Sequence, residues 1–70
     1  MEIIIKDRLK ELRKEFRETQ VQVASDVGIA EQHYQKLEYG ENYPGIETAW
    51  KLADHFNVTI DYLVGRTDNR

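Results

Sequence analysis

Four polar side chains between residues 31 and 36 are spaced so that a helix would present them on one side. They are Glu31, Gln32, Gln35 and Lys36. At about 100° per residue they cover about 140° of a helical wheel, while the apolar Tyr34 and Leu37 point in nearly the opposite direction. Amide, ammonium and carboxylate groups can pair with nucleobase edges: glutamine with adenine, lysine with guanine, and glutamate with the amino group of cytosine. The pattern predicts a helix that is anchored by Tyr34 and Leu37 and offers its polar side to such edges.

Several of these residues have a second interpretation. Glu31 stands in the first turn of the helix, where a carboxylate favours the helix dipole, so a structural role competes with base recognition. Tyr34 has a ring that can stack on a base, but its inward position favours the core. Tyr43 follows the helix, and either a packing role in the turn or a phosphate contact through its hydroxyl is open. Trp50 can anchor a partner, although partial packing in the core is favoured.

The polar helix is expected to follow a second, shorter one. Thr19 and Gln22 form the Thr-x-x-Gln pattern of a capping box, which starts a helix at Thr19. Gly28 supplies the positive φ that ends a helix. The polar helix then covers residues 30–39, with Ala30 a poor N-cap and Gly40 at its end. Two helices joined by a tight glycine turn, over residues 19–38, form a helix-turn-helix, and its second helix fits a DNA major groove about 12 Å wide.

Three further helices are predicted around this unit. The first has the inner stripe Ile5, Leu9, Leu12 and Phe16. Gly45 caps a fourth helix, which has Trp50 on its flank and the inner stripe Ile46, Ala49, Leu52, Ala53 and Phe56. Thr59 caps a short last helix over residues 60–64, which Gly65 ends, and the tail over residues 66–70 is expected to fray. The sequence therefore predicts a single all-α domain of five helices over residues 1–70, with no strand signal.

Composition and charge narrow the possible functions. A chain of 70 residues without cysteine forms neither a disulfide nor a thiolate metal site, and it fits a reducing cytosol. The net charge is −3, but six of the ten basic residues lie between Lys6 and Arg17, whereas residues 18–65 hold eight acidic residues against Lys36 and Lys51. We expect Arg13 and Arg17 to be solvated, with contact to a flanking nucleic-acid backbone as the alternative. No apolar run approaches the roughly 20 residues that span a bilayer, so we expect no membrane partner.

Enzymatic chemistry has no support in the residue pattern. There is no nucleophile–base pair, no phosphate-cradling glycine loop and no run with metal-ligand spacing. His33 and His55 stand 22 residues apart without a cysteine or a paired-carboxylate signature. We therefore expect no enzyme, no metal site, no cofactor and no small-molecule ligand.

The segment from Thr19 to Arg66 resembles the helix-turn-helix domain of phage Cro and repressor proteins, the XRE family. Comparable residues stand in register at Thr19-Gln20, Val23-Ala24, Val27-Gly28-Ile29, Lys36-Leu37-Glu38, Gly40, Pro44, Glu47-Thr48, Lys51-Leu52-Ala53 and Asp61-Tyr62-Leu63. The stretch RLKELRKE, residues 8–15, is similar to the first helix of that family. The resemblance covers residues 5–66, and it implies the five-helix lambda-repressor-like fold. It also implies a sequence-specific DNA-binding transcriptional regulator of phage type, for which repression is the usual outcome.

The resemblance also implies roles for single residues. Base contacts fall to Glu31, Gln32, Gln35 and Lys36 on the recognition helix. For the DNA backbone the resemblance implies a contact from Gln20, and we expect further backbone contacts from Thr19, His33, Asn42 and Tyr43. Where the family often has lysine or arginine, this chain has Glu31 and Glu41. We therefore expect a homodimer on a palindromic operator, since a dimer doubles the phosphate contacts and sets two recognition helices roughly 34 Å apart.

Some alternatives stay open. The chain is compatible with a complete Cro-like protein and with the N-terminal part of a longer one. The acidic surface over residues 18–61 also fits a protein-interaction module on the same fold, such as an antitoxin-like or anti-regulator protein with weak or no DNA binding. The candidates for a dimer surface are the apolar residues Ile3 to Ile5, Tyr62 and Val64. We expect a cytoplasmic protein, bacterial or phage-encoded.

Overall fold

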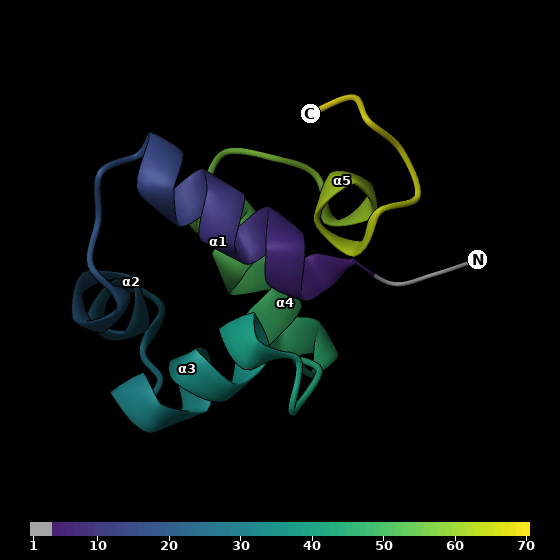
Figure 1. The fold of residues 1–70 in the computed structure, drawn as a ribbon. Helices are drawn as coiled ribbons and strands as arrows, with labels where there is room; N and C mark the ends of the chain where they lie inside the picture. Colours follow the sequence, from purple (N-terminus) through teal and green to yellow (C-terminus); the bar gives the residue numbers. More distant parts are fainter. Residues whose placement is uncertain (1–3) are drawn as a thin grey trace.

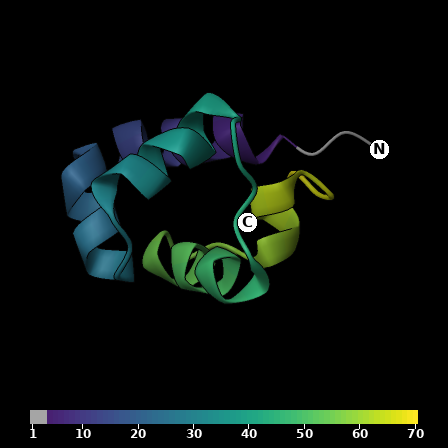
Figure 2. The same cartoon turned by 90° about the horizontal axis from the view of Figure 1, so that it is seen from below.

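Five helices make up the fold in a computed structural model, which describes residues 4–70. They are α1 (Ile5–Glu15), α2 (Gln20–Val27), α3 (Glu31–Tyr39), α4 (Ile46–His55) and α5 (Ile60–Val64) (Figure 1). α1 packs against α3 and α5, α2 against α3 and α4, and α4 against α5. The view in Figure 2 shows these helices arranged around a common centre, with α2 and α5 at opposite ends. Since no strand occurs over the described range, the prediction of an all-α fold of five helices is confirmed.

All five helices contribute side chains to one hydrophobic core. Its buried members are Ile5, Leu9, Leu12, Val23, Ala24, Val27, Tyr34, Leu37, Leu52, Ala53, Phe56, Tyr62 and Leu63. The predicted stripe of the first helix is therefore right for three of its four residues and wrong for Phe16, which is 41% exposed. α1 ends at Glu15, so Phe16 lies beyond the helical register and packs its ring edge to face on Phe56, with the ring centroids 5.4 Å apart.

The inner stripe predicted for the fourth helix is wrong at its first position. Ala49, Leu52 and Ala53 are buried, but Ile46 is 74% exposed. Ile46 has the right periodicity, yet it begins α4 and lies outside the buried cluster. Trp50 is 61% exposed, so the favoured interpretation as partial core packing is also wrong. The helix instead buries a narrow face of Ala49, Leu52 and Ala53, and it leaves the large apolar side chains of Ile46 and Trp50 exposed.

Two connections depend on residues in the left-handed region of backbone space. Phe16 at the end of α1 is followed by Arg17 with φ 57°, and Phe56 at the end of α4 is followed by Asn57 with φ 56°. In both places the left-handed residue reverses the chain after a phenylalanine that closes the helix. Side chains other than glycine rarely adopt this region, and asparagine tolerates it better than arginine.

The C-terminal tail is fixed to α1, so the prediction that it frays is wrong. Asp68 pairs with Arg8 at 2.7 Å, and Arg70 pairs with Glu15 at 2.6 Å. The centre of the Tyr62 ring lies 3.9 Å from the guanidinium carbon of Arg8 and 5.4 Å from that of Arg70. Arginine in the tail thus adds ion-pair and cation–π contacts to a segment with few apolar residues.

Two of the five apolar residues expected at a dimer surface lie in the core instead. Ile5 is 2% exposed and Tyr62 is 7% exposed, so neither offers a free surface. Val64 and Ile4 are half-buried, and Ile3 lies outside the described residues. The sequence could not separate these residues from core residues because both kinds are apolar.

Candidate nucleic-acid interface

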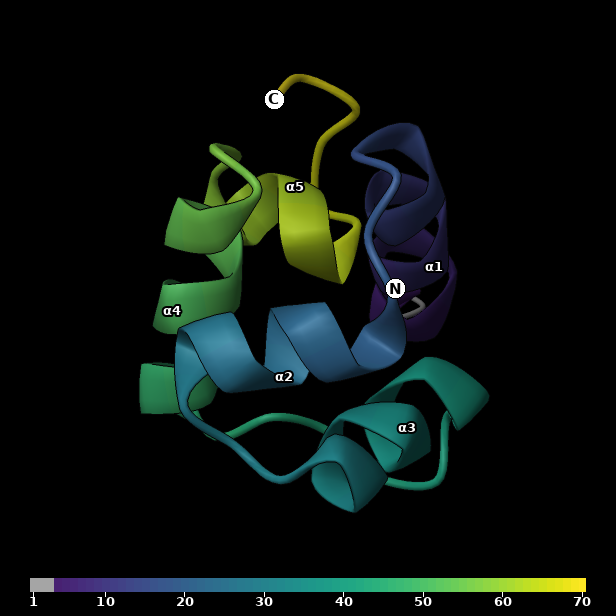
Figure 3. The same cartoon turned by 90° about the vertical axis from the view of Figure 1, so that its left-hand side faces the viewer.

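The connection between α2 and α3 follows the predicted pattern closely. The backbone nitrogen of Gln22 donates to Thr19 Oγ1 at 3.2 Å, and the backbone nitrogen of Thr19 donates to Gln22 Oε1 at 2.8 Å. This reciprocal pair confirms the capping box. Gly28 ends α2 with φ 77°, which turns the chain toward α3. Figure 3 shows α2 lying across α3, with α3 at the outer edge of the molecule.

α3 is anchored on one side and open on the other. Tyr34 and Leu37 are fully buried, as the helical wheel predicts. Glu31, Gln32 and Lys36 are exposed and Gln35 is half-buried. The polar groups predicted to read base edges are therefore presented together on the outer side of a short helix.

The beginnings of α2 and α3 expose backbone amides. The amides of Gln20 and Val21 at the start of α2 find no acceptor within residues 4–70. α3 has Ala30 as its N-cap, whose side chain offers no hydrogen bond, as predicted. Amides at a helix start, together with the helix dipole, bind phosphate groups well. Both helices that form the outer edge can therefore accept an anion at their first turn.

The side chains expected at the DNA backbone lie on the surface. Thr19, His33, Asn42 and Tyr43 are exposed, and Gln20 is half-buried. Asn42 and Tyr43 belong to the connection that leaves α3 through Gly40, whose φ is 78°. A Cβ atom on that glycine would come within 2.8 Å of Lys6 Cδ, so a larger residue there would displace the lysine as well as strain the backbone.

A buried ion pair fastens α3 to α1. Arg13 Nε donates to Glu38 Oε2 at 2.6 Å, and Arg13 Nη2 donates to Glu38 Oε1 at 3.1 Å. The Glu38 side chain is completely buried and that of Arg13 is 17% exposed, so the expectation of a solvated Arg13 is wrong. Burial is the largest influence and would raise the pKa of Glu38, but the polar contacts with Arg13, Tyr34 and Gln20 and the charge of Arg13 together outweigh it and hold the pKa of this carboxyl below its usual 4.5.

Glu38 was not predicted to be a structural residue. Its position gave a signal, since it stands four residues after the buried Tyr34 and so lies on the same face of the helix. The hydroxyl oxygen of Tyr34 is buried next to this region and has no hydrogen-bond partner of good geometry in the described part of the chain. Burial raises the pKa of this hydroxyl, so it stays protonated.

Hydrogen bonds connect the buried pair to the outer side of α3. Gln20 Nε2 donates to Glu38 Oε1 at 3.3 Å. Gln35 Nε2 donates to Gln20 Oε1 at 3.3 Å and to Glu31 Oε2 at 3.3 Å. The backbone-contact candidate Gln20 and the base-contact candidates Gln35 and Glu31 therefore form one connected set, which the sequence did not reveal.

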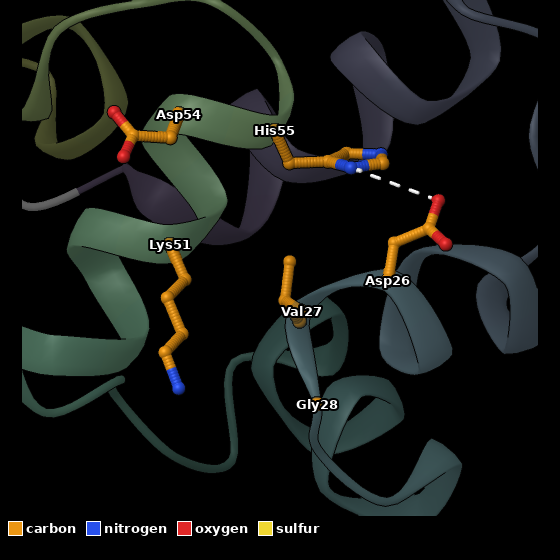
Figure 4. A pocket seen from close by; sticks show the side chains of 6 residues that line it. All are labelled: Asp26, Val27, Gly28, Lys51, Asp54 and His55. Carbon is orange, nitrogen blue, oxygen red and sulfur yellow. Dashed lines mark ion pairs between the residues drawn. The ribbon is translucent and has the colours of Figure 1, made fainter.

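A second polar cluster joins the α1–α2 connection, α2 and α4. His55 Nε2 lies 2.8 Å from Glu18 Oε1, and His55 Nδ1 lies 3.8 Å from Asp26 Oδ2. Figure 4 shows Asp26 turned toward His55 beside a pocket that Lys51 and Asp54 also line. Imidazole and carboxylate are metal-ligand types, and these donor atoms lie within 4.8 Å of one another. Of the two contacts only the one between His55 Nε2 and Glu18 Oε1 is a hydrogen bond, because 3.8 Å between Nδ1 and Asp26 Oδ2 exceeds hydrogen-bonding distance.

A capped short helix, a left-handed glycine and an anchored helix with an exposed polar side define a helix-turn-helix protein. The chain belongs to the helix-turn-helix family, whose model matches residues 9–63. The predicted resemblance to phage repressors and the lambda-repressor-like fold are both confirmed by the relatives described next. None of the described helices is long and apolar enough to cross a membrane.

Two curated relatives are transcriptional regulators. The cryptic phage CTXphi transcriptional repressor RstR of Vibrio cholerae is 44% identical over 62 residues, which cover 89% of this chain and 55% of the relative. The regulator AnsR of Bacillus subtilis is 42% identical over 60 residues, which cover 86% of this chain and 52% of the relative. The chain thus spans about half the length of these relatives.

Solved structures share the fold. A transcriptional regulator from Listeria innocua matches with a TM-score of 0.87 and 29% identity, over 93% of this chain and 61% of that one. The P22 c2 repressor, solved in complex with a synthetic operator, matches with a TM-score of 0.83 and 23% identity, over 86% of this chain and 91% of that one.

Proposed function

We propose that this protein is a sequence-specific DNA-binding transcriptional regulator that inserts α3 into the major groove of an operator. One observation carries the proposal: α3 is held by the buried Tyr34 and Leu37 and turns its polar side chains outward, in a chain of the helix-turn-helix family. That family is a class of DNA-binding regulators and not a class of enzymes. Since one relative is a phage repressor, we further propose repression, by occupation of the operator in the cytoplasm.

Two sets of residues would divide the work at the operator. Base edges are contacted by Glu31, Gln32, Gln35 and Lys36. The DNA backbone is contacted by Thr19, Gln20, His33, Asn42 and Tyr43. Gln20 Nε2 uses one hydrogen for Glu38, and the amide has a second hydrogen that can reach a phosphate. Phosphate contacts fix the register of the protein on the duplex, and the base contacts supply the sequence preference.

We also propose that the regulator is a homodimer on a palindromic site. The outer side of α3 offers a single lysine, Lys36, and the phosphate attraction of one copy is weak. Two large apolar side chains are free to hold a second copy: Ile46 is 74% exposed and Trp50 is 61% exposed. Ile46 and Tyr43 also line an apolar groove with Pro44 and Val64. Aromatic residues of this kind are typical anchors of protein interfaces.

The test is an unbiased selection of double-stranded DNA at low and moderate salt. We expect one enriched site with dyad symmetry, and an affinity that falls as salt increases. The second candidate function is a protein-interaction module on the same fold, which is favoured by the exposed apolar residues and by Glu31 and Glu41 near the proposed groove contact. Selection without any enriched sequence would support that candidate and reject DNA recognition.

A further inference from the structure

The hydrogen bonds that lead from the core to α3 have a fixed direction. The buried carboxylate of Glu38 is held by two hydrogen bonds from Arg13 and can only accept. Gln20 must therefore turn its NH2 group toward Glu38, and its carbonyl oxygen then faces Gln35. Exchanging the oxygen and nitrogen of the Gln20 amide would place two acceptors against each other at Glu38.

The same constraint passes to Gln35. Its NH2 group donates to Gln20 Oε1 and to the carboxylate of Glu31, so both of its hydrogens have acceptors inside the protein. Each of these partners presents only an acceptor to Gln35. The carbonyl oxygen Oε1 is the polar atom that remains for a ligand. A side chain that ordinarily both donates and accepts is thus restricted to one role.

We infer that Gln35 reads DNA as a hydrogen-bond acceptor only, and that Glu38 and Gln20 are positioning residues that impose this role. The inference rests on the proposed function. In the major groove adenine N6 and cytosine N4 carry amino groups that donate, whereas guanine O6 and thymine O4 accept. The base facing Gln35 is therefore adenine or cytosine, and guanine and thymine are rejected because two acceptors would meet.

Gln32 provides an internal comparison on the same helix. It is exposed, and its side chain makes no hydrogen bond to any described residue. Its amide is free to rotate, so it can donate and accept at once, as in the bidentate pairing of glutamine with adenine N6 and N7. Gln32 and Gln35 are the same residue type, but their surroundings give them different hydrogen-bonding capacity toward a ligand. Gln35 can only accept, whereas Gln32 can donate and accept.

The test begins with the operator that the unaltered protein selects. Gln35→Ala identifies the position that Gln35 reads, as the one at which base preference is lost, and Gln32→Ala is the matched control that leaves this position unchanged. We expect adenine or cytosine there. Replacing that adenine by purine, or that cytosine by 2-pyrimidinone, removes the amino group and should weaken binding about three- to tenfold. For adenine, the 7-deaza analogue removes only the N7 acceptor and should bind as before.

The positioning role has its own measurement. Gln20→Met keeps the length of the side chain but releases the Gln35 amide, so guanine and thymine should become acceptable at that one position. Loss of a phosphate contact alone would lower the affinity for all sequences alike and leave the preference intact. Glu38→Gln should act in the same direction, because an amide at residue 38 can donate as well as accept. Gln20→Met is the decisive variant, since it removes one hydrogen bond to Glu38 but leaves both members of the buried ion pair and the two hydrogen bonds between them in place.

Several results would overturn the inference. Selection of guanine or thymine opposite Gln35, equal sensitivity to loss of N6 and of N7, or an unchanged preference in Gln20→Met would each reject it while DNA recognition stands. A Gln35→Ala variant with unaltered preference at every position would do the same. If the unaltered protein enriches no sequence, the proposed function fails first, and the inference fails with it.

Discussion

Arg13 on α1 and Glu38 on α3 are joined by two hydrogen bonds, of 2.6 and 3.1 Å, around a carboxylate with no exposed surface. The pair fastens α3 to α1 from the inside. Through Gln20 the same carboxylate also reaches the side chains that we propose to contact DNA. Fold stability and the proposed base recognition therefore share one buried residue, and the two can be separated only by variants that leave Glu38 in place.

Removing Arg13 should show how strongly an unpaired charge on Glu38 destabilises the fold. Arg13→Ala leaves Glu38 without its cation, and we expect the free energy of unfolding to fall by about 3 kcal/mol, because an unpaired buried carboxylate is strongly destabilising. Urea denaturation followed by circular dichroism measures this. The double variant Arg13→Met with Glu38→Leu removes the charge altogether and should regain much of the loss. Equal stability of Arg13→Ala and the unaltered protein would contradict the account of this pair.

Acid should weaken the fold through the same residue. The pKa of Glu38 in the folded protein lies below its unfolded value of 4.5, since the contacts with Arg13, Tyr34 and Gln20 and the charge of Arg13 together outweigh the effect of burial. The folded state then binds fewer protons, so this contribution to stability is fully present above about pH 4.5 and is lost as the pH falls through the folded pKa. Unfolding free energies measured between pH 7 and pH 3 should show this loss. The loss should be smaller in Glu38→Gln, and a curve unchanged by that variant would refute the assignment.

Tyr34 offers a test of the buried hydroxyl. Tyr34→Ala should cost about 3–5 kcal/mol, because it empties a fully buried site. Tyr34→Phe removes only a hydroxyl that lies near Glu38 without a hydrogen bond of good geometry to any residue within 4–70, so we expect its melting temperature to change little. A clear loss of stability in the phenylalanine variant would mean that the hydroxyl donates to a neighbour after all.

The single lysine on the outer side of α3 should govern affinity. Lys36→Ala is expected to weaken operator binding, and titrations at several salt concentrations tell which group it contacts. A salt slope reduced by about one identifies a phosphate, whereas an unchanged slope with a lost guanine preference identifies a base. Lys51→Ala is the matched control, because Lys51 lies on α4 and pairs with Glu47 at 3.2 Å. If the Lys36→Ala variant bound the operator with full affinity, the proposal that α3 inserts into the major groove would be rejected.

The exposed apolar side chains should hold the dimer together. Trp50→Glu places a charge among them. Sedimentation over a range of concentrations should then show a monomer, and the circular dichroism spectrum should show that the fold is unchanged. Val21→Glu is a suitable control, since Val21 is 52% exposed on α2 and does not line the grooves formed by Ile46 and Trp50. If Trp50→Glu sediments like the unaltered protein, another surface makes the dimer or none does.

The sequence predicted those features that depend on local chemistry. The capping box of Thr19 and the left-handed Gly28 each rest on contacts within a few residues, and both occur as expected. The burial of Tyr34 and the exposure of Gln32 and Lys36 also follow from the position of each residue around one helix. Such features need no knowledge of what packs on the other side.

The features that were missed depend on distant segments. Arg13 belongs to a basic stretch that reads as solvated, and only the arrival of α3 with Glu38, 25 residues later, makes it structural. Ile46 and Trp50 have helical spacing, but whether an apolar side chain is buried depends on which other segments pack over it. The carboxylates around His55 belong to two other segments of the chain. No local sequence pattern could therefore predict this cluster.

Arg17 and Asn57 have a practical consequence for anyone who handles this domain. Both keep side chains at backbone angles that glycine adopts without strain, and both are exposed in connections outside the helices. Arginine tolerates a positive φ less well than asparagine does. Replacing Arg17 by glycine should therefore relieve more conformational strain than the same replacement of Asn57. The thermal stability of the domain can therefore be raised by substitutions at these two loop positions. Such substitutions change neither the hydrophobic core nor the proposed DNA-binding surface.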